Sequence, residues 1–457
     1  MINFLRIMLL IMPIAPMCSF TIPLSPLKIS TLLSSSGSSD AASSRSSPEI
    51  CPSFKVMDQV ALAVKLESEG KHVCHLEVGQ PLKPAPSQVL SAAKDALNDD
   101  RLGYTHALGI TELREAIARR YSKQYPDVTE PVNPDDIVVV TGSSAGFLLA
   151  FTALFDPNDN VAVPSTCYPC YRNILGALAV NCVSLKLNSD YKITAKELRE
   201  EVERRKNEGK ESLKGLILSS PGNPTGATLN KKELYELCRA CEELDVRFIS
   251  DEIYHGIVYD ELLNNEATAL GCVEGRRSSL VINSFSKYQC MTGWRLGWLV
   301  LPEDRSIRDS INRLAQNMYI NAPTLSQKAA VALFDDPEVE EELQRRVEEY
   351  AKSRKVVLNT LTELELNTPG SIAPADGAFY VYVDLGSKAR NDATNLCVRL
   401  LKEAGVAITP GSDFEERDMG NELGERRIRF SYAGGVEEVS EGMRRFKEWW
   451  PIWEKGE

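Results

Sequence analysis

The feature that most constrains the fold is a series of short, mostly apolar segments, each of which ends in a polar or glycine-rich loop before a helical pattern begins. These segments span residues 137–141, 161–163, 215–218, 246–249 and 279–282. Segments that are apolar at most positions are typical of strands buried on both faces, as in parallel sheets covered by helices. The sequence therefore predicts an α/β fold with a mostly parallel sheet flanked by helices, and ligand-binding loops at the carboxyl edge of that sheet.

The chain beyond Pro302 is helical over long stretches and contains two further strand patterns, at residues 378–383 and 427–431. They predict a smaller α+β domain. In the second strand Arg429 alternates with Ile428 and Phe430, so we expect its guanidinium to point away from the packed face. The alternative is an exposed arginine at a sheet edge.

Residues 1–47 differ in composition from the rest of the chain. Residues 4–20 are apolar with Arg6 as the single charge, but Pro13 and Pro16 interrupt the run, and no acidic residue occurs before Asp40. We expect a cleaved targeting segment, because the apolar half resembles a secretory signal and the serine-rich half resembles a transit peptide. Delivery to an organelle (plastid or mitochondrion) or by the secretory route is the expectation, and a disordered tail is the alternative.

The charge balance excludes two classes of ligand. The 457 residues carry a formal net charge of -12. A protein that binds nucleic acid or an anionic membrane needs a basic face. We therefore expect small-molecule partners, no nucleic acid, and no membrane for the mature chain.

The chain has 11 cysteines, and four of them form two pairs with the spacing of zinc ligands. These pairs are Cys167 with Cys170 and Cys238 with Cys241. The second pair falls on the apolar face of a helical pattern, beside Leu237. Core packing explains that pair better than a metal does, so we predict no metal site.

Lys287 lies in a polar loop after the apolar segment 279–282, and Arg295 follows it beside two glycines. An unprotonated lysine amine condenses with aldehydes to a Schiff base. A neighbouring guanidinium favours the neutral amine and can bind a phosphate through two hydrogen bonds. The loop predicts a nucleophilic lysine, and the alternative is a solvated loop lysine.

Two other loops offer groups that suit such a lysine. Residues 142–146 form a small-residue turn between a strand and a helical pattern at 147–154, which predicts an anion site because the first amides of a helix lack internal partners. The turn matches neither a Walker loop nor a dinucleotide-binding loop. Asp251 follows an apolar strand, so its carboxylate needs a cationic partner unless it caps a helix.

Further candidates lie on loops between the predicted elements. Gly79 allows a close approach of the backbone to a ligand. Tyr104 is presented before a helix that we expect Thr111 to cap. Tyr168 can lie flat on a planar ligand, and Asn223 is held in a rigid Pro-Gly-Asn-Pro turn.

Four of these segments resemble the fold type I pyridoxal-phosphate-dependent aminotransferases, the class I/II aminotransferase family. They are residues 219–226, 250–254, 284–297 and 429–431, and the likeness extends over residues 56–434. The resemblance implies a large domain with a mostly parallel sheet, a smaller α+β domain, pyridoxal 5′-phosphate as cofactor, and a homodimer with its site at the subunit interface. With this architecture the expected parts are a targeting or disordered segment at 1–47, an N-terminal arm with part of the small domain at 48–95, a large cofactor-binding domain at 96–325, and a C-terminal small domain at 326–457.

The resemblance also implies roles for the candidate residues. Lys287 would form the Schiff base with the cofactor and move the substrate proton, and Asp251 would pair with the pyridinium nitrogen. Asn223 and Tyr254 would bind the phenolic oxygen, and Tyr168 would stack on the ring. The phosphate would be held by Ser143, Ser144, Ser284 and Arg295, with Tyr104 from the second subunit. Arg429, with Asn223 and the Gly79 backbone, would bind the substrate carboxylate.

The implied activity is transfer of an amino group from an L-amino acid to a 2-oxo acid by a ping-pong mechanism, with 2-oxoglutarate as the expected acceptor. No clear second arginine is placed for a distal carboxylate, so aromatic, aliphatic and aspartate-like donors stay open. A carbon–sulfur lyase of the same fold and a non-catalytic binding protein are the alternatives. The segment Met291-Thr-Gly-Trp-Arg295 resembles transaminases more than lyases, and Lys287 and Asp251 are both present.

Overall fold

The computed structural model describes residues 52–262, 266–415 and 423–456. The chain from residue 44 onward forms one compact unit. The predicted targeting segment at 1–47 lies outside the described residues, so its destination stays a prediction. In the described part of the chain, no helix combines the length and the apolar character that crossing a membrane would require.

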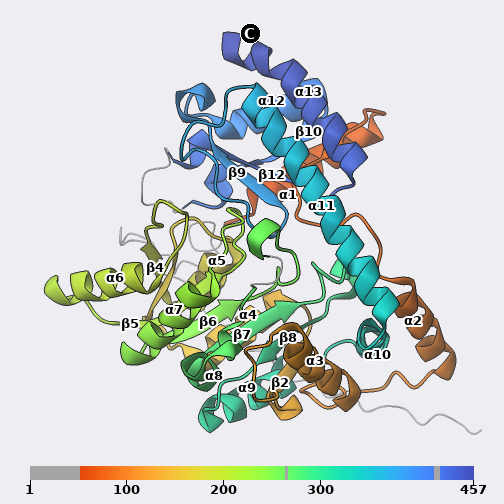
Figure 1. Ribbon diagram of the computed structural model, residues 1–457, viewed down its shortest axis with the longest axis vertical. Helices are drawn as coiled ribbons and strands as arrows, with labels where there is room; N and C mark the ends of the chain where they lie inside the picture. The colour runs from red at the N-terminus through yellow and green to blue at the C-terminus, as the bar shows by residue number, and fades with distance from the viewer. Residues whose placement is uncertain (1–51, 263–265, 416–422, 457) are drawn as a thin grey trace, which may run out of the picture. The chain divides into compact units, whose positions relative to one another are not determined.

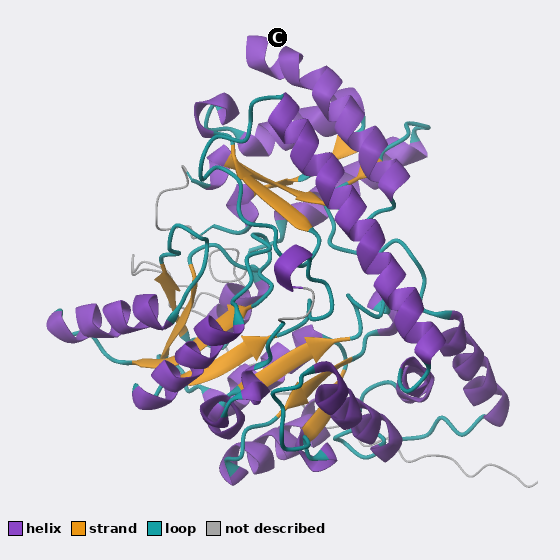
Figure 2. Cartoon of the chain, viewed as in Figure 1, coloured by secondary structure: helices purple, strands orange, loops and turns teal. Residues whose placement is uncertain are grey.

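A seven-stranded sheet organises the larger part of this unit (Figures 1 and 2). Its order is β2-β8-β7-β6-β5-β3-β4. The strands are β2 (Ile137–Val140), β3 (Asn160–Pro164), β4 (Asn181–Leu185), β5 (Leu213–Ser219), β6 (Arg247–Asp251), β7 (Leu280–Ser284) and β8 (Gly297–Val300). The pairs among β3 to β7 are parallel, whereas β8 runs antiparallel to both β7 and β2. The mostly parallel sheet predicted from the sequence is confirmed.

The connection between β7 and β8, residues 285–296, contains no α-helix of the kind that usually makes the crossover between parallel strands. The chain therefore turns back beside β7, and this reversal carries both Lys287 and Arg295. The antiparallel strand thus brings the two predicted site residues to the edge of the sheet at which the parallel strands end.

Successive side chains of the strands enter two different cores, as a sheet buried on both faces requires. Val139 and Phe248 belong to one core, and Val138 and Ile249 belong to the other. The first core also takes in α3 (Thr111–Gln124), α6 (Ala195–Asn207) and α7 (Lys231–Glu243), and the second takes in α4 (Ser143–Leu154), α5 (Cys170–Ala177) and α9 (Arg305–Met318). The short α8 (Val273–Ser278) precedes β7.

The smaller α+β part contains a three-stranded antiparallel sheet, and its middle strand is β12. Its strands are β9 (Tyr380–Asp384), β11 (Thr409–Pro410) and β12 (Arg427–Ser431), and beside them β1 (Cys74–His75) pairs in parallel with β10 (Val406–Ala407). The helices are α1 (Lys55–Ser68), α12 (Ala393–Ala404) and α13 (Val436–Lys455), and the long α11 (Pro337–Glu363) leads to them from α2 (Ser87–Asp99) and α10 (Thr324–Ala330) (Figure 1). The domain boundaries drawn from the sequence stay predictions.

Two local predictions were wrong. Thr111 is the first residue of α3, and Ile110 occupies the cap position without a side-chain hydrogen bond. The helix predicted from residue 147 begins at Ser143, because the left-handed Gly142 (φ 78°) turns the chain directly into α4. Cys238 and Cys241 lie on the buried face of α7, as predicted.

The two cores, one on each face of the large sheet, predict where truncation of a side chain will destabilise the protein. Leu237→Ala in α7 removes a fully buried side chain, so we expect the free energy of unfolding to fall by about 2–5 kcal/mol. The measurement is the midpoint of urea denaturation. Leu97→Ala in α2 is the matched control, because Leu97 is 54% exposed and its truncation should cost less than about 0.5 kcal/mol. Equal shifts in the two variants would contradict the assigned core.

Candidate active site

Lys287 is partly buried and its amine is tied to the backbone of a distant segment. Nζ donates a hydrogen bond to the carbonyl oxygen of Gly79 at 2.7 Å. Burial, followed by the positive charges of Arg429 and Arg295, lowers the pKa of this amine to about 8. Far more of it is therefore unprotonated near neutral pH than at the ordinary lysine pKa of 10.5, and the unprotonated amine is the nucleophile. The alternative of a solvated loop lysine is wrong.

The start of α4 and the guanidinium of Arg295 form a cradle for an anion. A Cβ atom on Gly142 would lie 2.3 Å from Nη2 of Arg295, so only glycine leaves room for the guanidinium there. Arg295 Nη1 donates to the carbonyl of Thr292 at 2.9 Å, which fixes the side chain. Ser143 and Ser144 are the first residues of the 12-residue helix α4, whose leading amides lack internal partners. A guanidinium beside such amides suits a phosphate.

Ser284 reaches the same place through the sheet register. It is the last residue of β7 and pairs with Gly297, which pairs on its other side with Val140, two residues before Gly142. Its hydroxyl is buried and accepts a hydrogen bond from the amide of Ser286 at 3.1 Å. The register therefore brings Ser284 to the strand edge beside the cradle.

Asp251 ends β6 and is completely buried. Its hydrogen-bond donors are neutral, namely the hydroxyl of Tyr171 and the amide of Ile253 at 3.2 Å. Burial raises the pKa of this carboxyl to about 7, against the lowering effect of these hydrogen bonds. No helix begins here, so the helix-cap alternative is wrong. A carboxylate in this position suits a ligand that brings its own positive charge.

Arg429 is buried in the middle strand β12, so the alternative of an exposed edge arginine is wrong. Its guanidinium lies between the rings of Tyr380 and Phe414, 4.4 Å and 4.5 Å from their centroids. Nη1 donates to Oδ1 of Asn223 at 2.8 Å, and Nη2 donates to the carbonyl of Glu77. The structure therefore brings together Arg429 of the smaller part and Asn223 of the larger part.

Tyr254 and Tyr380 share a hydrogen bond between their hydroxyls at 2.8 Å. A Cβ atom on Gly79 would overlap the Tyr380 hydroxyl at 1.7 Å, so the close backbone approach predicted at Gly79 is made to this tyrosine. Tyr168 is half-buried and packs edge-on against Tyr171, whose ring lies 5.7 Å away.

Of the predicted site residues, Tyr104 is the one that the structure does not bring into contact with the side chains described above. Its side chain is 84% exposed on the loop between α2 and α3. Sequence reasoning missed Tyr171, Tyr380 and Phe414. Tyr171 and Tyr380 lie in segments that the patterns singled out, whereas no local signal distinguishes Phe414.

Known proteins share both the sequence and the fold of this chain. A family model described as aminotransferase class I and II matches residues 71–446. A valine–pyruvate aminotransferase of Mycobacterium tuberculosis is 40% identical over 403 residues, which are 88% of this chain and 97% of the relative. A (5-formylfuran-3-yl)methyl phosphate transaminase of Methanocaldococcus jannaschii is 37% identical over 87% of this chain and 96% of its own. The crystal structure of an aminotransferase from M. tuberculosis matches with a TM-score of 0.80 and 40% identity, over 90% of this chain and 100% of that chain.

The cradle at Gly142 generates a prediction about phosphate binding. Gly142→Ala places a methyl group against Arg295 and strains a positive φ, so we expect the affinity of the apoprotein for pyridoxal phosphate to fall at least about tenfold. Gly293→Ala is the matched control, because no atom lies within 4 Å of a Cβ built there. Titration of the apoprotein with the cofactor measures both variants, and equal affinities would contradict the cradle.

The lowered pKa of Lys287 predicts how its amine reacts. In the apoprotein we expect the rate of Lys287 modification by an amine-specific reagent to rise with pH to a plateau with a midpoint of about 8, because only the neutral amine reacts. Competitive labelling followed by mass spectrometry measures this rate, with the exposed Lys232 as the internal reference. A midpoint at the ordinary lysine value of 10.5 would contradict the prediction.

Proposed function

Because the chain belongs to the class I and II aminotransferases, which use pyridoxal phosphate, we propose that it takes the amino group of a neutral L-amino acid and passes it to a monocarboxylic 2-oxo acid. The charge around Lys287 carries this proposal. Two guanidinium groups act on its amine, those of Arg429 and Arg295. Arg295 lies in the cradle at Gly142, so of these two cations Arg429 is the one left for a substrate carboxylate.

The name of one relative supports the same substrate class. The aminotransferase of M. tuberculosis that is 40% identical is named for valine and pyruvate, a branched apolar donor and a monocarboxylic acceptor. A second carboxylate, as in aspartate or 2-oxoglutarate, would need a further cation or would lose solvation without compensation. The acceptor expected from the sequence, 2-oxoglutarate, is therefore the competitor in the experiment below.

The residues of the site fit pyridoxal phosphate in three respects. The cradle at Gly142 suits a phosphate, the buried Asp251 carboxylate with its neutral hydrogen-bond donors suits a protonated ring nitrogen, and the amine of Lys287 is available to an aldehyde. When bound, the cofactor supplies that aldehyde and a ring that accepts the electron pair released at the substrate α-carbon.

We assign the holding of the cofactor to side chains that the sheet edge and its loops place together. Asp251 would keep the proton on the ring nitrogen, and Tyr168 would cover the ring. Oδ1 of Asn223 accepts a hydrogen bond from Arg429, so its Nδ2 group is left to donate to the phenolic oxygen, alongside the hydroxyl of Tyr254. The phosphate is held by Ser143, Ser144, Ser284 and Arg295.

Lys287 and Arg429 act on the substrate. Lys287 would anchor the cofactor through Nζ, and the same atom would take the proton from the substrate α-carbon. Its low pKa keeps Nζ able to accept that proton. Arg429 orients the substrate carboxylate, with the backbone at Gly79 beside it, and the rings of Tyr380 and Phe414 fix the guanidinium plane and exclude water from it.

We also propose that two copies of the chain complete the site. Tyr104 is 84% exposed and makes no contact with its own cluster, which suits a side chain that reaches the phosphate of a second subunit. A measurement of mass in solution tests the dimer, and Tyr104→Phe should weaken cofactor binding without changing that mass.

A half-reaction screen tests the substrate class. We expect the holoenzyme mixed with valine or another apolar amino acid to convert its cofactor to the amine form once and then stop, because no acceptor is present. The change in cofactor absorption measures this step. Aspartate should react with a kcat/KM at least about tenfold lower, which corresponds to about 1.4 kcal/mol, and pyruvate should regenerate the enzyme faster than 2-oxoglutarate does. Faster reaction of aspartate and 2-oxoglutarate would overturn the proposal, and continuous release of ammonia would indicate a lyase.

Lys287→Ala is the control for the chemistry. We expect turnover to fall at least about 1,000-fold, because the group that anchors the cofactor and moves the proton is gone. Lys447→Ala, which removes a surface lysine paired with Glu363, should leave turnover unchanged.

A further inference from the structure

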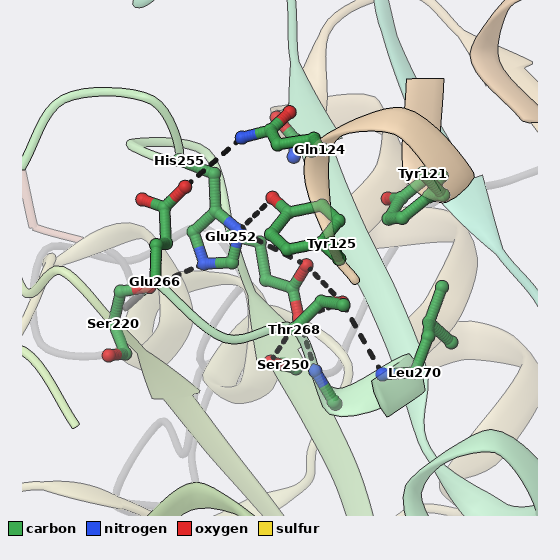
Figure 3. A network of polar contacts seen from close by, with 12 residues as sticks. Tyr121, Gln124, Tyr125, Ser220, Ser250, Glu252, His255, Glu266, Thr268 and Leu270 are labelled. Carbon is green, nitrogen blue, oxygen red and sulfur yellow. Dashed lines mark hydrogen bonds and ion pairs between the residues drawn. The ribbon is translucent and has the colours of Figure 1, made fainter. Parts of the chain in front are cut away.

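A buried polar network surrounds Glu252 and His255, just after the end of β6 (Figure 3). The next residue, Glu252, is 1% exposed, and His255, three positions further, is 3% exposed. Titratable side chains are rarely buried this deeply unless they are paired and hydrogen-bonded. Neither residue belongs to the set that binds the cofactor or the substrate, so the network has no role in the function proposed above.

Glu252 is surrounded by neutral donors and one histidine. Its oxygens accept hydrogen bonds from the hydroxyl of Ser250 at 3.0 Å, the hydroxyl of Thr268 at 2.8 Å and the amide of Ala269 at 2.9 Å. Oε2 lies 3.5 Å from Nδ1 of His255. His255 is therefore the group that can bring a positive charge to this carboxylate.

His255 has a different partner on each ring nitrogen. Nε2 lies 3.0 Å from the carbonyl oxygen of Ser220, and Nδ1 lies 2.6 Å from the hydroxyl of Tyr125. A carbonyl oxygen can only accept, so Nε2 carries a hydrogen. Nδ1 faces both Tyr125 and Glu252 (Figure 3).

The contact with Ser220 joins two segments of the active site. Ser220 belongs to the loop that carries Asn223, and its amide donates to the carbonyl of Asp251 at 3.2 Å. His255 belongs to the turn that carries Asp251 and Tyr254. The histidine ring thus links the loop and the turn to each other.

The outer side of the turn is fastened as well. The carboxylate of Glu266 accepts the amide of Gly256 at 3.0 Å and the side-chain amide of Gln124 at 3.1 Å. Gln124 and Tyr125 are consecutive residues at the end of α3. The charged or titratable groups around His255 are therefore Glu252 and Asp251 on its own turn, Tyr125 on α3, and Glu266 beyond that turn, while the charge of Arg120 also acts on Tyr125.

We propose that His255 is a positioning residue of the reaction, which fastens the Asn223 loop to the Asp251 turn and, with Glu252, sets the charge beside Asp251. The inference rests on the role proposed for Asp251 as the partner of the cofactor's ring nitrogen. A positive charge on His255 lowers the pKa of Asp251, and the charge of Glu252 raises it, both on top of the larger effect of burial. The two neighbours therefore act on Asp251 with opposite signs.

The site needs the ionised form of Asp251, and this requirement sets the direction in which each charge change moves the pH dependence of cofactor binding. The carboxylate holds the proton on the ring nitrogen, and this form is lost as the pH falls through the pKa of Asp251. Removing the positive charge of His255 raises that pKa, so cofactor binding is lost at a higher pH. Removing the negative charge of Glu252 lowers it, so binding persists to a lower pH.

The experiment measures the affinity of the apoprotein for pyridoxal phosphate as a function of pH, by protein fluorescence, in two variants. In His255→Gln an amide donor to Ser220 can remain, but the charge is gone. We expect the acid limb of the profile, where affinity falls as the pH is lowered, to move up by about one pH unit. At a given pH on that limb, binding should be about tenfold weaker. In Glu252→Gln we expect a smaller movement of the limb to lower pH. Opposite movements are a result that general damage to packing would not produce.

Three further variants make the outcome decisive. Tyr235→Phe removes a hydroxyl that donates to Asp127 and should change nothing. Asp251→Asn should weaken cofactor binding strongly; if it does not, the role of Asp251 itself is wrong. Tyr125→Phe leaves the imidazole in place and should move the limb less than His255→Gln does.

If Asp251→Asn weakens binding but the limb stays in place in His255→Gln, or moves the same way in both charge variants, the inference about His255 is overturned. Should His255→Gln fail to fold, Glu252→Gln decides by itself, because a limb that does not move to lower pH overturns the inference.

Discussion

The burial of the Asp251 carboxylate is the constraint on which the active site depends. A carboxylate enclosed by neutral donors is unfavourable until a positive charge arrives, and burial raises its pKa to about 7. The protein compensates in part with the hydroxyl of Tyr171 and the amide of Ile253. In the proposed function a protonated ring nitrogen would relieve the remaining cost on binding, so the burial that destabilises the carboxylate would also contribute affinity for the cofactor.

Lys287 faces the reverse situation at the same sheet edge. Burial and two nearby guanidinium groups make its charged form unfavourable, so a neutral amine is available near neutral pH. Burial in one enclosed region of low polarity thus moves the two pKa values toward each other: it raises the pKa of the Asp251 carboxyl and lowers the pKa of the Lys287 amine. This pairing of shifts is common at active sites because both effects come from the exclusion of water.

The contact between Arg429 and Asn223 connects the two sheets of the molecule. Asn223 lies after β5 of the large sheet, and Arg429 lies in the middle strand of the small one. Because the guanidinium is also held between Tyr380 and Phe414, its orientation depends on β9, β12 and the loop after β11 together. In the proposed function, substrate binding at Arg429 and cofactor binding at Asn223 would both depend on this one contact between the two parts of the chain.

The sequence by itself determined the parallel sheet and the place of the loops at its edge, and it singled out most of the residues that the structure brings together around Lys287, because apolar strands, glycine turns and polar loop residues are local signals. It misjudged the cap at Thr111 and the start of α4, where one glycine with a positive φ decided the boundary. Only the tertiary structure decided which groups surround Asp251 and Arg429. Tyr171 lies 80 residues before Asp251, Phe414 lies 15 residues before Arg429, and His255 lies 4 residues after Asp251. Their roles follow from burial and hydrogen-bond geometry, which depend on how the segments of the chain pack and not on the spacing along the sequence.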